Sequence, residues 1–267
     1  MRLALWQTTG FPAAVESNLR ALEQTARSAG AASAELLLCP ECWLCGYNIG
    51  SAVAGLAQTR DGPAACRIAA IAREHGLAIA YGYAERDPTS GRVYNSVQVM
   101  GAGGQPLAGY RKTHLFGPDE RAAYEPGTQL EPLFTFADFK VGLLVCYDVE
   151  YPEAVRSLAL LGAELILVPT ALPAEYTAIP DFVVPARSVE NQLFIAYCNR
   201  AGVENGLRFL GRSCLTGPDG KSVAAAGAGE TLLIADISRS TIQAAVQSYP
   251  YLKDRRPELY GRVTARS

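Results

Sequence analysis

The 267-residue sequence has few of the residues that most metal and nucleic-acid sites need. It contains only two histidines, His75 and His114, and neither belongs to a paired metal-ligand motif. It has no run of lysine or arginine, since the densest basic cluster, at 253–256, includes an aspartate and the net charge is −2. These absences argue against a metal site, and against nucleic acid or an anionic membrane as a partner.

Long hydrophobic runs are missing as well. No apolar run reaches the roughly 18 residues that suggest a membrane-spanning helix, because the best candidate, at 161–174, is interrupted by Glu164 and two prolines. The apolar stretch within residues 1–10 is too short for a signal peptide. The seven cysteines are an odd number and do not resemble a disulfide scaffold. We therefore expect a cytoplasmic protein with free thiols.

The sequence does contain an alternation of short apolar runs and amphipathic helical patterns, and 49% of it is hydrophobic. Predicted strands cover 3–8, 35–40, 77–85, 93–100, 106–112, 139–148, 164–170, 194–199 and 231–237, with a strand and turn at 214–221. Predicted helices cover 13–29, 63–75, 152–162 and 181–192. The segment 113–131 has no clear period and is predicted to be a long, functional loop. The pattern predicts an α/β layered sandwich, and no linker divides the single domain at 1–267.

The stretch "LLLCPECWLCGYN" (36–48) offers two candidate chemistries. Cys39, Cys42 and Cys45 are spaced like the start of an iron–sulfur ligand run, but no fourth cysteine follows. We expect them to be buried as small apolar side chains. Glu41 between them is either a surface acid after a strand or a general base at the carboxyl end of that strand, where sites in open α/β sheets collect.

Two further residues stand at the ends of predicted strands. Cys146 follows an apolar strand and precedes a turn and a helix, an arrangement that can hold a nucleophile on a tight turn. A structural buried cysteine is the alternative. Lys112 ends a strand and opens the 113–131 loop. It is either a solvated lysine or a cation that stabilises charge developing on a carbonyl oxygen.

The joint pattern of these residues resembles the nitrilase superfamily, the carbon–nitrogen hydrolases that use a Glu–Lys–Cys triad. Glu41 lies in "LLLCPECWLCGYN", Lys112 in "YRKTHLFGPDE", and Cys146 in "VGLLVCYDVEYPEAVRSLALLGAELILVPTA". The three motifs occur in the family's order, and the likeness runs from "RLALWQ" to "YLKDRRPELY". The resemblance implies a four-layer α-β-β-α sandwich that forms a homodimer, with a C-terminal tail at 249–267 that lies at the subunit interface.

The resemblance also implies roles for individual residues. Cys146 would be the nucleophile, Glu41 its base, and Lys112 with the backbone N–H of Tyr147 the oxyanion donors. The family's second glutamate lies six residues before a Pro-Gly pair, which selects Glu120 rather than Glu125. No metal or organic cofactor is implied.

The sequence leaves the substrate open among several classes. Tyr147-Asp148 after the cysteine resembles amidases, whereas many nitrilases have Trp-Glu there. Nitriles, N-carbamoyl amines and a catalytically silent binding protein remain alternatives. Glu150 and Tyr47 are the candidate substrate-binding residues. An acid at Glu150 favours a substrate with a remote ammonium, such as 5-aminopentanamide, unless Glu150 pairs locally, for example with Arg187.

Overall fold

The computed structural model describes residues 1–130, 133–263 and 265, and its centre is a pair of six-stranded sheets. The first sheet has the order β14 (Thr231–Asp236), β1 (Arg2–Gln7), β2 (Leu36–Leu38), β3 (Ala78–Arg86), β4 (Val93–Met100) and β5 (Pro106–Arg111). The second has the order β13 (Ser222–Ala225), β12 (Cys214–Thr216), β9 (Phe194–Asn199), β8 (Leu165–Thr170), β7 (Phe139–Leu143) and β6 (Leu133–Phe136). A short hairpin, β10 (Val203–Glu204) and β11 (Leu207–Arg208), stands apart from both.

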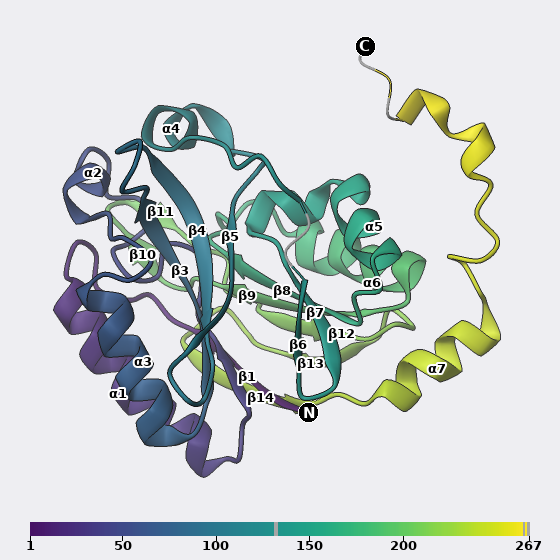
Figure 1. Ribbon diagram of the computed structural model, residues 1–267, viewed down its shortest axis with the longest axis horizontal. Helices are drawn as coiled ribbons and strands as arrows, with labels where there is room; N and C mark the ends of the chain where they lie inside the picture. Colours follow the sequence, from purple (N-terminus) through teal and green to yellow (C-terminus); the bar gives the residue numbers. More distant parts are fainter. Residues whose placement is uncertain (131–132, 264, 266–267) are drawn as a thin grey trace.

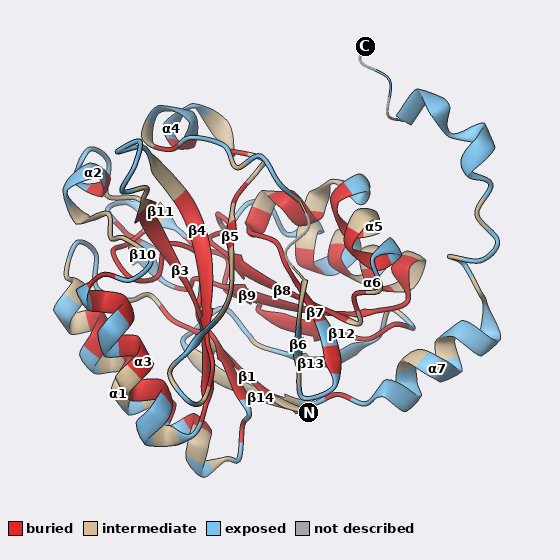
Figure 2. Cartoon of the chain, in the orientation of Figure 1, coloured by how far each residue is buried: buried red, intermediate tan, exposed pale blue. Residues whose placement is uncertain are grey.

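Helices cover the outer face of each sheet (Figure 1), and the burial pattern follows these layers (Figure 2). The helices α1 (Val15–Ala31) and α3 (Pro63–His75) pack on the first sheet, while α5 (Pro152–Leu160) and α6 (Val184–Asn191) pack on the second. Neighbouring side chains of β1 point to opposite sides: Leu3 and Leu5 join the core between the sheets, and Ala4 joins the core under α1 and α3. The predicted four-layer α-β-β-α sandwich is therefore confirmed.

The parallel strands bring the carboxyl ends of both sheets to one place. In the first sheet β1, β2 and β3 run parallel, and in the second β7, β8 and β9 do so. The turn after β2 meets the end of β8, where the Glu41 N–H donates to the Thr170 carbonyl at 3.4 Å. Polar side chains that follow parallel strands are thus collected between the two sheets.

Several elements differ from the sequence prediction, which also missed the strands β6, β10, β11 and β13 and a short helix at Ala52–Leu56. The predicted loop at 113–131 contains a helix, α4 (Gly117–Ala123), which is too short to show a helical period. The predicted strand at 139–148 ends as β7 at Leu143, and a 3₁₀ turn (Cys146–Glu150) replaces its last residues. The helix α7 (Arg239–Ser248) was not predicted, and none of its residues is buried.

The remaining elements lie at the edges of the sandwich. They are α2 (Ala52–Leu56), a π-helical turn (Ile179–Val183) before α6, and two 3₁₀ turns (Pro257–Leu259 and Gly261–Val263). After α7 the chain extends away from the sandwich as an arm (Figure 1), and its side chains at Tyr249 and Leu259 are exposed. In the described part of the chain, no helix is both long and apolar enough to cross a membrane.

Candidate active site

Lys112 and two carboxylates form a buried ionic cluster between the sheets. The Lys112 Nζ donates to Glu41 Oε1 at 2.7 Å and to Glu120 Oε1 at 2.8 Å. Glu41 and Lys112 are fully buried and Glu120 is only 4% exposed. Removing such charges from water is costly unless they are paired, so the cluster is held together by its own electrostatics. The structure thus brings together three of the residues that the sequence selected.

Each member of this cluster is positioned by the backbone beside it. Glu41 lies in the turn after β2, which packs so closely on β3 that a Cβ at Gly82 would lie 2.5 Å from the Pro40 carbonyl oxygen. Lys112 follows β5 directly, and its N–H donates to the Asn95 carbonyl of β4 at 2.8 Å. Glu120 lies on α4, so the short helix that the sequence did not reveal supplies the second carboxylate.

Asn95 is a site residue that the sequence analysis missed. Its Nδ2 donates to Glu41 Oε1 at 2.7 Å, the same oxygen that Lys112 contacts. Glu41 Oε2 is buried and has no hydrogen-bond partner in the described part of the chain. One oxygen of Glu41 is therefore fixed by two donors while the other stays available to accept a proton.

Cys146 begins the 3₁₀ turn and has a backbone φ of 47°, a left-handed conformation that non-glycine residues seldom adopt. Such strain is concentrated at functional sites. The side chain is buried, and it lies close enough to Glu41, Lys112 and Glu120 for their charges to act on the thiol. The structure therefore places the predicted nucleophile beside the ionic cluster.

Burial and charge set the protonation states of these groups. Burial raises the pKa of the Cys146 thiol well above its usual value, and the Glu41 carboxylate raises it further although Lys112 opposes this. Burial also raises the pKa of Glu41, against the lowering effect of Lys112. Burial lowers the pKa of Lys112, but the two carboxylates outweigh it and hold that pKa well above its usual value. A neutral thiol thus lies beside a carboxylate with an enhanced affinity for protons.

Asp148 ties the Lys112 segment to the Cys146 turn, and the sequence analysis gave it no structural role. Its Oδ1 accepts from Thr113 Oγ1 at 3.0 Å and from the His114 backbone N–H at 2.9 Å. Its Oδ2 accepts from Tyr110 Oη at 2.9 Å and from the Val145 N–H at 3.0 Å. The carboxylate is fully buried, so it braces the strained turn against the end of β5.

Tyr47 contacts the cluster through its hydroxyl, which donates to Glu120 Oε1 at 2.7 Å. Its backbone N–H donates to Glu204 Oε1 at 2.7 Å, and Glu204 is itself paired with the buried Arg200. Arg200 Nη1 also reaches the Glu41 carbonyl at 3.5 Å. The Arg200–Glu204 pair, which the sequence did not indicate, therefore holds the turn that carries both Glu41 and Tyr47.

Glu150 lies at the end of the 3₁₀ turn and is half-buried. Burial raises the pKa of its carboxyl group, and Lys112 and Arg187 are near enough to oppose this. Arg187 donates to the Glu150 backbone carbonyl at 2.7 Å, whereas its side-chain ion pair is with Glu190 at 3.1 Å. In the described residues the Glu150 carboxylate has no hydrogen-bond or ion-pair partner, so the suggested side-chain pair with Arg187 is absent. The predicted role of the Tyr147 N–H stays a prediction.

The other sequence candidates lie outside the cluster. Glu125 is exposed and pairs with Arg92 at 3.6 Å, so Glu120 is the glutamate that reaches Lys112. Cys39 packs in the core under α1 and α3, whereas Cys42 and Cys45 pack in a smaller apolar cluster. Among the described residues, no three or more His, Cys, Asp and Glu side chains are grouped so as to hold a metal ion.

Comparisons with known proteins agree with this geometry. The family model described as carbon–nitrogen hydrolase matches residues 2–247. The protein named "Hydrolase in pqqF 5'region" of Pseudomonas protegens is 46% identical over 267 residues, covering 100% of this chain and 93% of that protein. An (R)-stereoselective amidase of Pseudomonas sp is 36% identical, covering 99% and 94%.

A solved structure extends this likeness to three dimensions. It is a variant of the amidase from Nesterenkonia sp. AN1, with the acetamide moiety of fluoroacetamide covalently added at the active site cysteine. It matches with a TM-score of 0.89 and 36% identity, covering 99% of this chain and 97% of that chain.

Proposed function

The chain belongs to the carbon–nitrogen hydrolase family and is an amidase of the nitrilase superfamily, and from this premise we propose that it hydrolyses small aliphatic primary amides through a thioester on Cys146. The observation that carries the proposal is the free Glu41 oxygen in a cluster that also contains Lys112 and acts on the Cys146 thiol. The covalent adduct on the Nesterenkonia cysteine supports the same chemistry.

The first half of the reaction forms the thioester. Glu41 takes the proton of the Cys146 thiol, and the thiolate attacks the amide carbon. Lys112 and the backbone N–H of Tyr147 stabilise the negative charge that develops on the carbonyl oxygen. Glu41 then gives its proton to the amide nitrogen, the C–N bond breaks, and ammonia leaves.

The second half releases the acid. Glu41 takes a proton from a water molecule as that water attacks the thioester carbon. The tetrahedral intermediate collapses, the C–S bond breaks, and the proton on Glu41 returns to the sulfur of Cys146. Glu120 remains paired with Lys112 and keeps the ammonium in place. Tyr47 in turn holds Glu120, so these two residues orient the cluster.

The environment of the Glu150 carboxylate supports a narrower class of substrate among the small aliphatic amides. Its carboxylate is half-buried beside the proposed nucleophile's turn and has no partner among the described residues. A carboxylate within about 4–6 Å of a ligand favours a cation, and a charge-assisted hydrogen bond is typically worth about 1.5–3 kcal/mol. The proposed substrate is therefore an ω-amino amide such as 5-aminopentanamide.

The experiment that tests this function is a panel of equal-length primary amides ending in amine, methyl or carboxylate. Ammonia release is measured with wild type and Glu150→Gln, and the matching nitrile and N-carbamoyl amine are included. We expect the amine-terminated amide to have the highest kcat/KM, and Glu150→Gln to remove that preference. If the methyl-terminated amide is best and the variant leaves the ranking unchanged, Glu150 does not select the substrate. Faster turnover of the nitrile or the carbamoyl compound would contradict the amide proposal itself.

The protein is further proposed to work in the cytoplasm as a homodimer built from one domain. All seven cysteines are free thiols, which suits a reducing compartment. The arm after α7 exposes Tyr249, Tyr251, Leu259 and Tyr260, and a second copy of the chain would cover them. Light scattering on the full chain and on a chain ending at residue 248 tests this. A dimer that persists without 249–267 would show that the tail is not the interface.

A further inference from the structure

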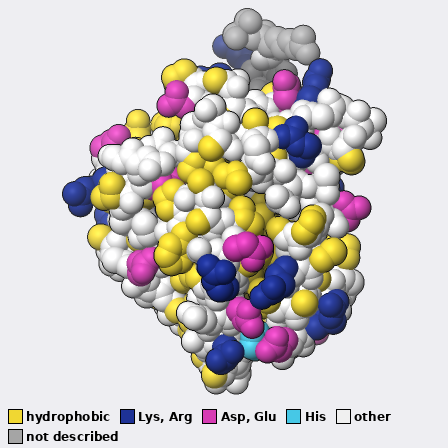
Figure 3. Space-filling view, turned by 90° about the vertical axis from the view of Figure 1, so that its left-hand side faces the viewer, with side chains coloured by type: hydrophobic (Ala, Val, Ile, Leu, Met, Phe, Trp, Pro, Cys, Tyr) yellow, Lys and Arg dark blue, Asp and Glu magenta, His cyan; other side chains and the backbone are white. Residues whose placement is uncertain are grey.

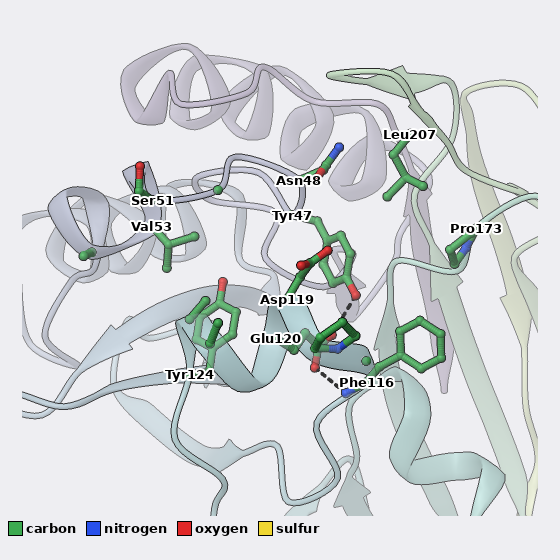
Figure 4. Close-up of a pocket in the computed structure, with 16 residues that line it drawn as sticks. Tyr47, Asn48, Ser51, Val53, Phe116, Asp119, Glu120, Tyr124, Pro173 and Leu207 are labelled. Atoms are coloured by element: carbon green, nitrogen blue, oxygen red, sulfur yellow. Dashed lines mark hydrogen bonds between the residues drawn. The ribbon is translucent and has the colours of Figure 1, made fainter.

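A cavity of about 740 Å³ opens beside the ionic cluster, between α2, α4 and the β10–β11 hairpin. Figure 4 shows α2 on one side of it and the Tyr47 and Phe116 side chains on the other. Hydrophobic side chains also gather near the centre of the molecular face that carries α2 (Figure 3). The volume lies within the 300–1,000 Å³ of typical small-molecule sites and far exceeds the needs of a two- or three-carbon amide.

The cavity shares part of its wall with the ionic cluster, through Glu120. Tyr47 and Glu120, which are hydrogen-bonded to each other, form part of its wall (Figure 4). Phe116 lines it and packs edge-on against Tyr147, the residue after Cys146, with 5.3 Å between ring centroids. Pro173 lines it as well, just beyond the end of β8. A molecule in the cavity would therefore lie next to the proposed catalytic cluster.

The walls combine apolar surface with a single unpaired charge. Val53, Phe116 and Leu207 supply apolar atoms, and none of the described residues that line the cavity is lysine or arginine. Its two carboxylates belong to Glu120, which is bonded to Lys112, and to Asp119. Asp119 is exposed, and its side chain has no hydrogen-bond or ion-pair partner in the described part of the chain. Figure 4 shows this carboxylate on the Tyr47 side of the cavity.

We propose that this cavity binds the non-reacting end of longer substrates, and that the enzyme also accepts amides with a long apolar body ending in an ammonium group beside Asp119. The proposal rests on the proposed function, because it assumes that the amide carbon is attacked by Cys146. It assigns a site distinct from Glu150, which does not line the cavity. Glu150 then acts on amines a few carbons long, whereas Asp119 acts on longer ones.

Amides with carbon chains of different lengths test whether the apolar part of the cavity binds the substrate. We expect kcat/KM for straight-chain primary amides to rise roughly fourfold with each added methylene until the cavity is filled, because each buried CH₂ favours binding by that factor. Ala54→Trp introduces a bulky ring into the lining of the cavity. Ala52→Trp places the same ring on the exposed surface of α2, outside the lining, and is the matched control. We expect the ratio of kcat/KM for octanamide to that for propanamide to fall at least tenfold in Ala54→Trp only.

Substrates with and without a terminal ammonium group test the role of the Asp119 carboxylate. An exposed carboxylate–ammonium pair has a small effect, so we expect Asp119→Asn to lower kcat/KM for 8-aminooctanamide about two- to fivefold relative to octanamide. Glu153→Gln, at an exposed acid outside the cavity lining, should leave that ratio unchanged. A flat chain-length profile, or equal effects of the two tryptophan variants, would overturn the cavity assignment. An unchanged ratio in Asp119→Asn would overturn the ammonium assignment. Failure of wild type to hydrolyse any amide, propanamide included, would instead overturn the proposed function.

Discussion

The ionic cluster and the adjoining cavity differ in how firmly their side chains are held. Glu41 and Lys112 are 0% exposed, and the hydrogen bonds of Glu41 Oε1 to Asn95 and Lys112 join fully buried side chains. Asp119, one residue before Glu120 on the same short helix, is exposed and unpaired in the described part of the chain. The helix α4 thus contributes one residue to each region, Glu120 to the cluster and Asp119 to the cavity. Reaction chemistry and substrate selection can therefore change separately on this fold.

The difference in burial explains why charges act more strongly in the cluster than in the cavity. In the cluster water is excluded, so each charge acts strongly on its neighbours and is already oriented before the reaction begins. At the mouth of the cavity water screens Asp119, and only apolar contact adds much affinity. Variants of the cluster should therefore change kcat greatly, whereas variants of the cavity should change kcat/KM between substrates.

The largest loss of activity should come from Cys146→Ala. Removing a proposed nucleophile typically costs about 10⁵–10⁶-fold in kcat. The melting temperature should stay close to that of wild type, because one sulfur is lost from a large core and the strained backbone is not otherwise changed. Ammonia release measures the loss, and Cys39→Ala, also fully buried but outside the cluster, is the control that should keep most activity. Substantial turnover by Cys146→Ala would refute the nucleophile assignment.

The second-largest loss of activity should come from Lys112→Met. Loss of one oxyanion donor lowers kcat about 10²–10³-fold. The variant also leaves Glu41 and Glu120 without their cation, which should lower the free energy of unfolding by about 3–5 kcal/mol. Steady-state kinetics and urea unfolding measure the two losses. Lys140→Met, at an exposed lysine, should cause neither, and a Lys112→Met variant with nearly normal kcat would separate the lysine from the chemistry.

Asp148→Asn should have a smaller effect on rate and a clear one on stability. Asparagine replaces one accepting oxygen by a donor that faces other donors, so at least one buried hydrogen bond is lost at about 1–3 kcal/mol. The Cys146 turn then loses its brace, and we expect kcat to fall roughly tenfold with KM less affected. Kinetics together with thermal unfolding check this. A lowered melting temperature with unchanged kcat would make Asp148 a purely structural residue.

The smallest effect should be a shift in pH dependence for Asn95→Ala. Activity requires ionised Glu41, so the acid limb of kcat/KM follows the pKa of this residue, which burial raises above the usual 4.5. The Asn95 hydrogen bond lowers that pKa, and its removal should move the acid limb to higher pH. Relative to wild type, the variant should lose more activity under mildly acidic conditions than at pH 8. An acid limb that stays in place, or moves to lower pH, would contradict the role of Glu41 as the base.

The sequence predicted those site residues that follow apolar strands. Glu41 and Lys112 lie directly beyond β2 and β5, so their positions could be read from the strand pattern. Asn95 and Asp148 could not be found in this way, because each acts across a contact between segments 54 and 38 residues apart whose register the sequence does not state. The helix α4 could not be predicted from the sequence because seven residues are too few to show a helical period.

The cavity was equally invisible in the sequence. Its lining comes from α2, α4, the Tyr47 turn and the β10–β11 hairpin, none of which forms a long periodic element. Asp119 stands beside Glu120 in the chain, yet one is exposed and the other buried because neighbouring helical residues point in different directions. Only the folded chain separates the residue that holds Lys112 from the one that faces the cavity.

The most direct test of the central claim is to locate the acyl group on the enzyme. A p-nitrophenyl ester acylates thiols quickly, so mixing it with the protein and quenching in acid should trap the thioester before it is hydrolysed. Peptide mass spectrometry should find one acyl group per chain on the peptide that contains Cys146, and a primary amide should compete with its formation. An acyl group on a different residue that the amide equally displaces, or a nitrophenol burst that persists in Cys146→Ala, would contradict the account.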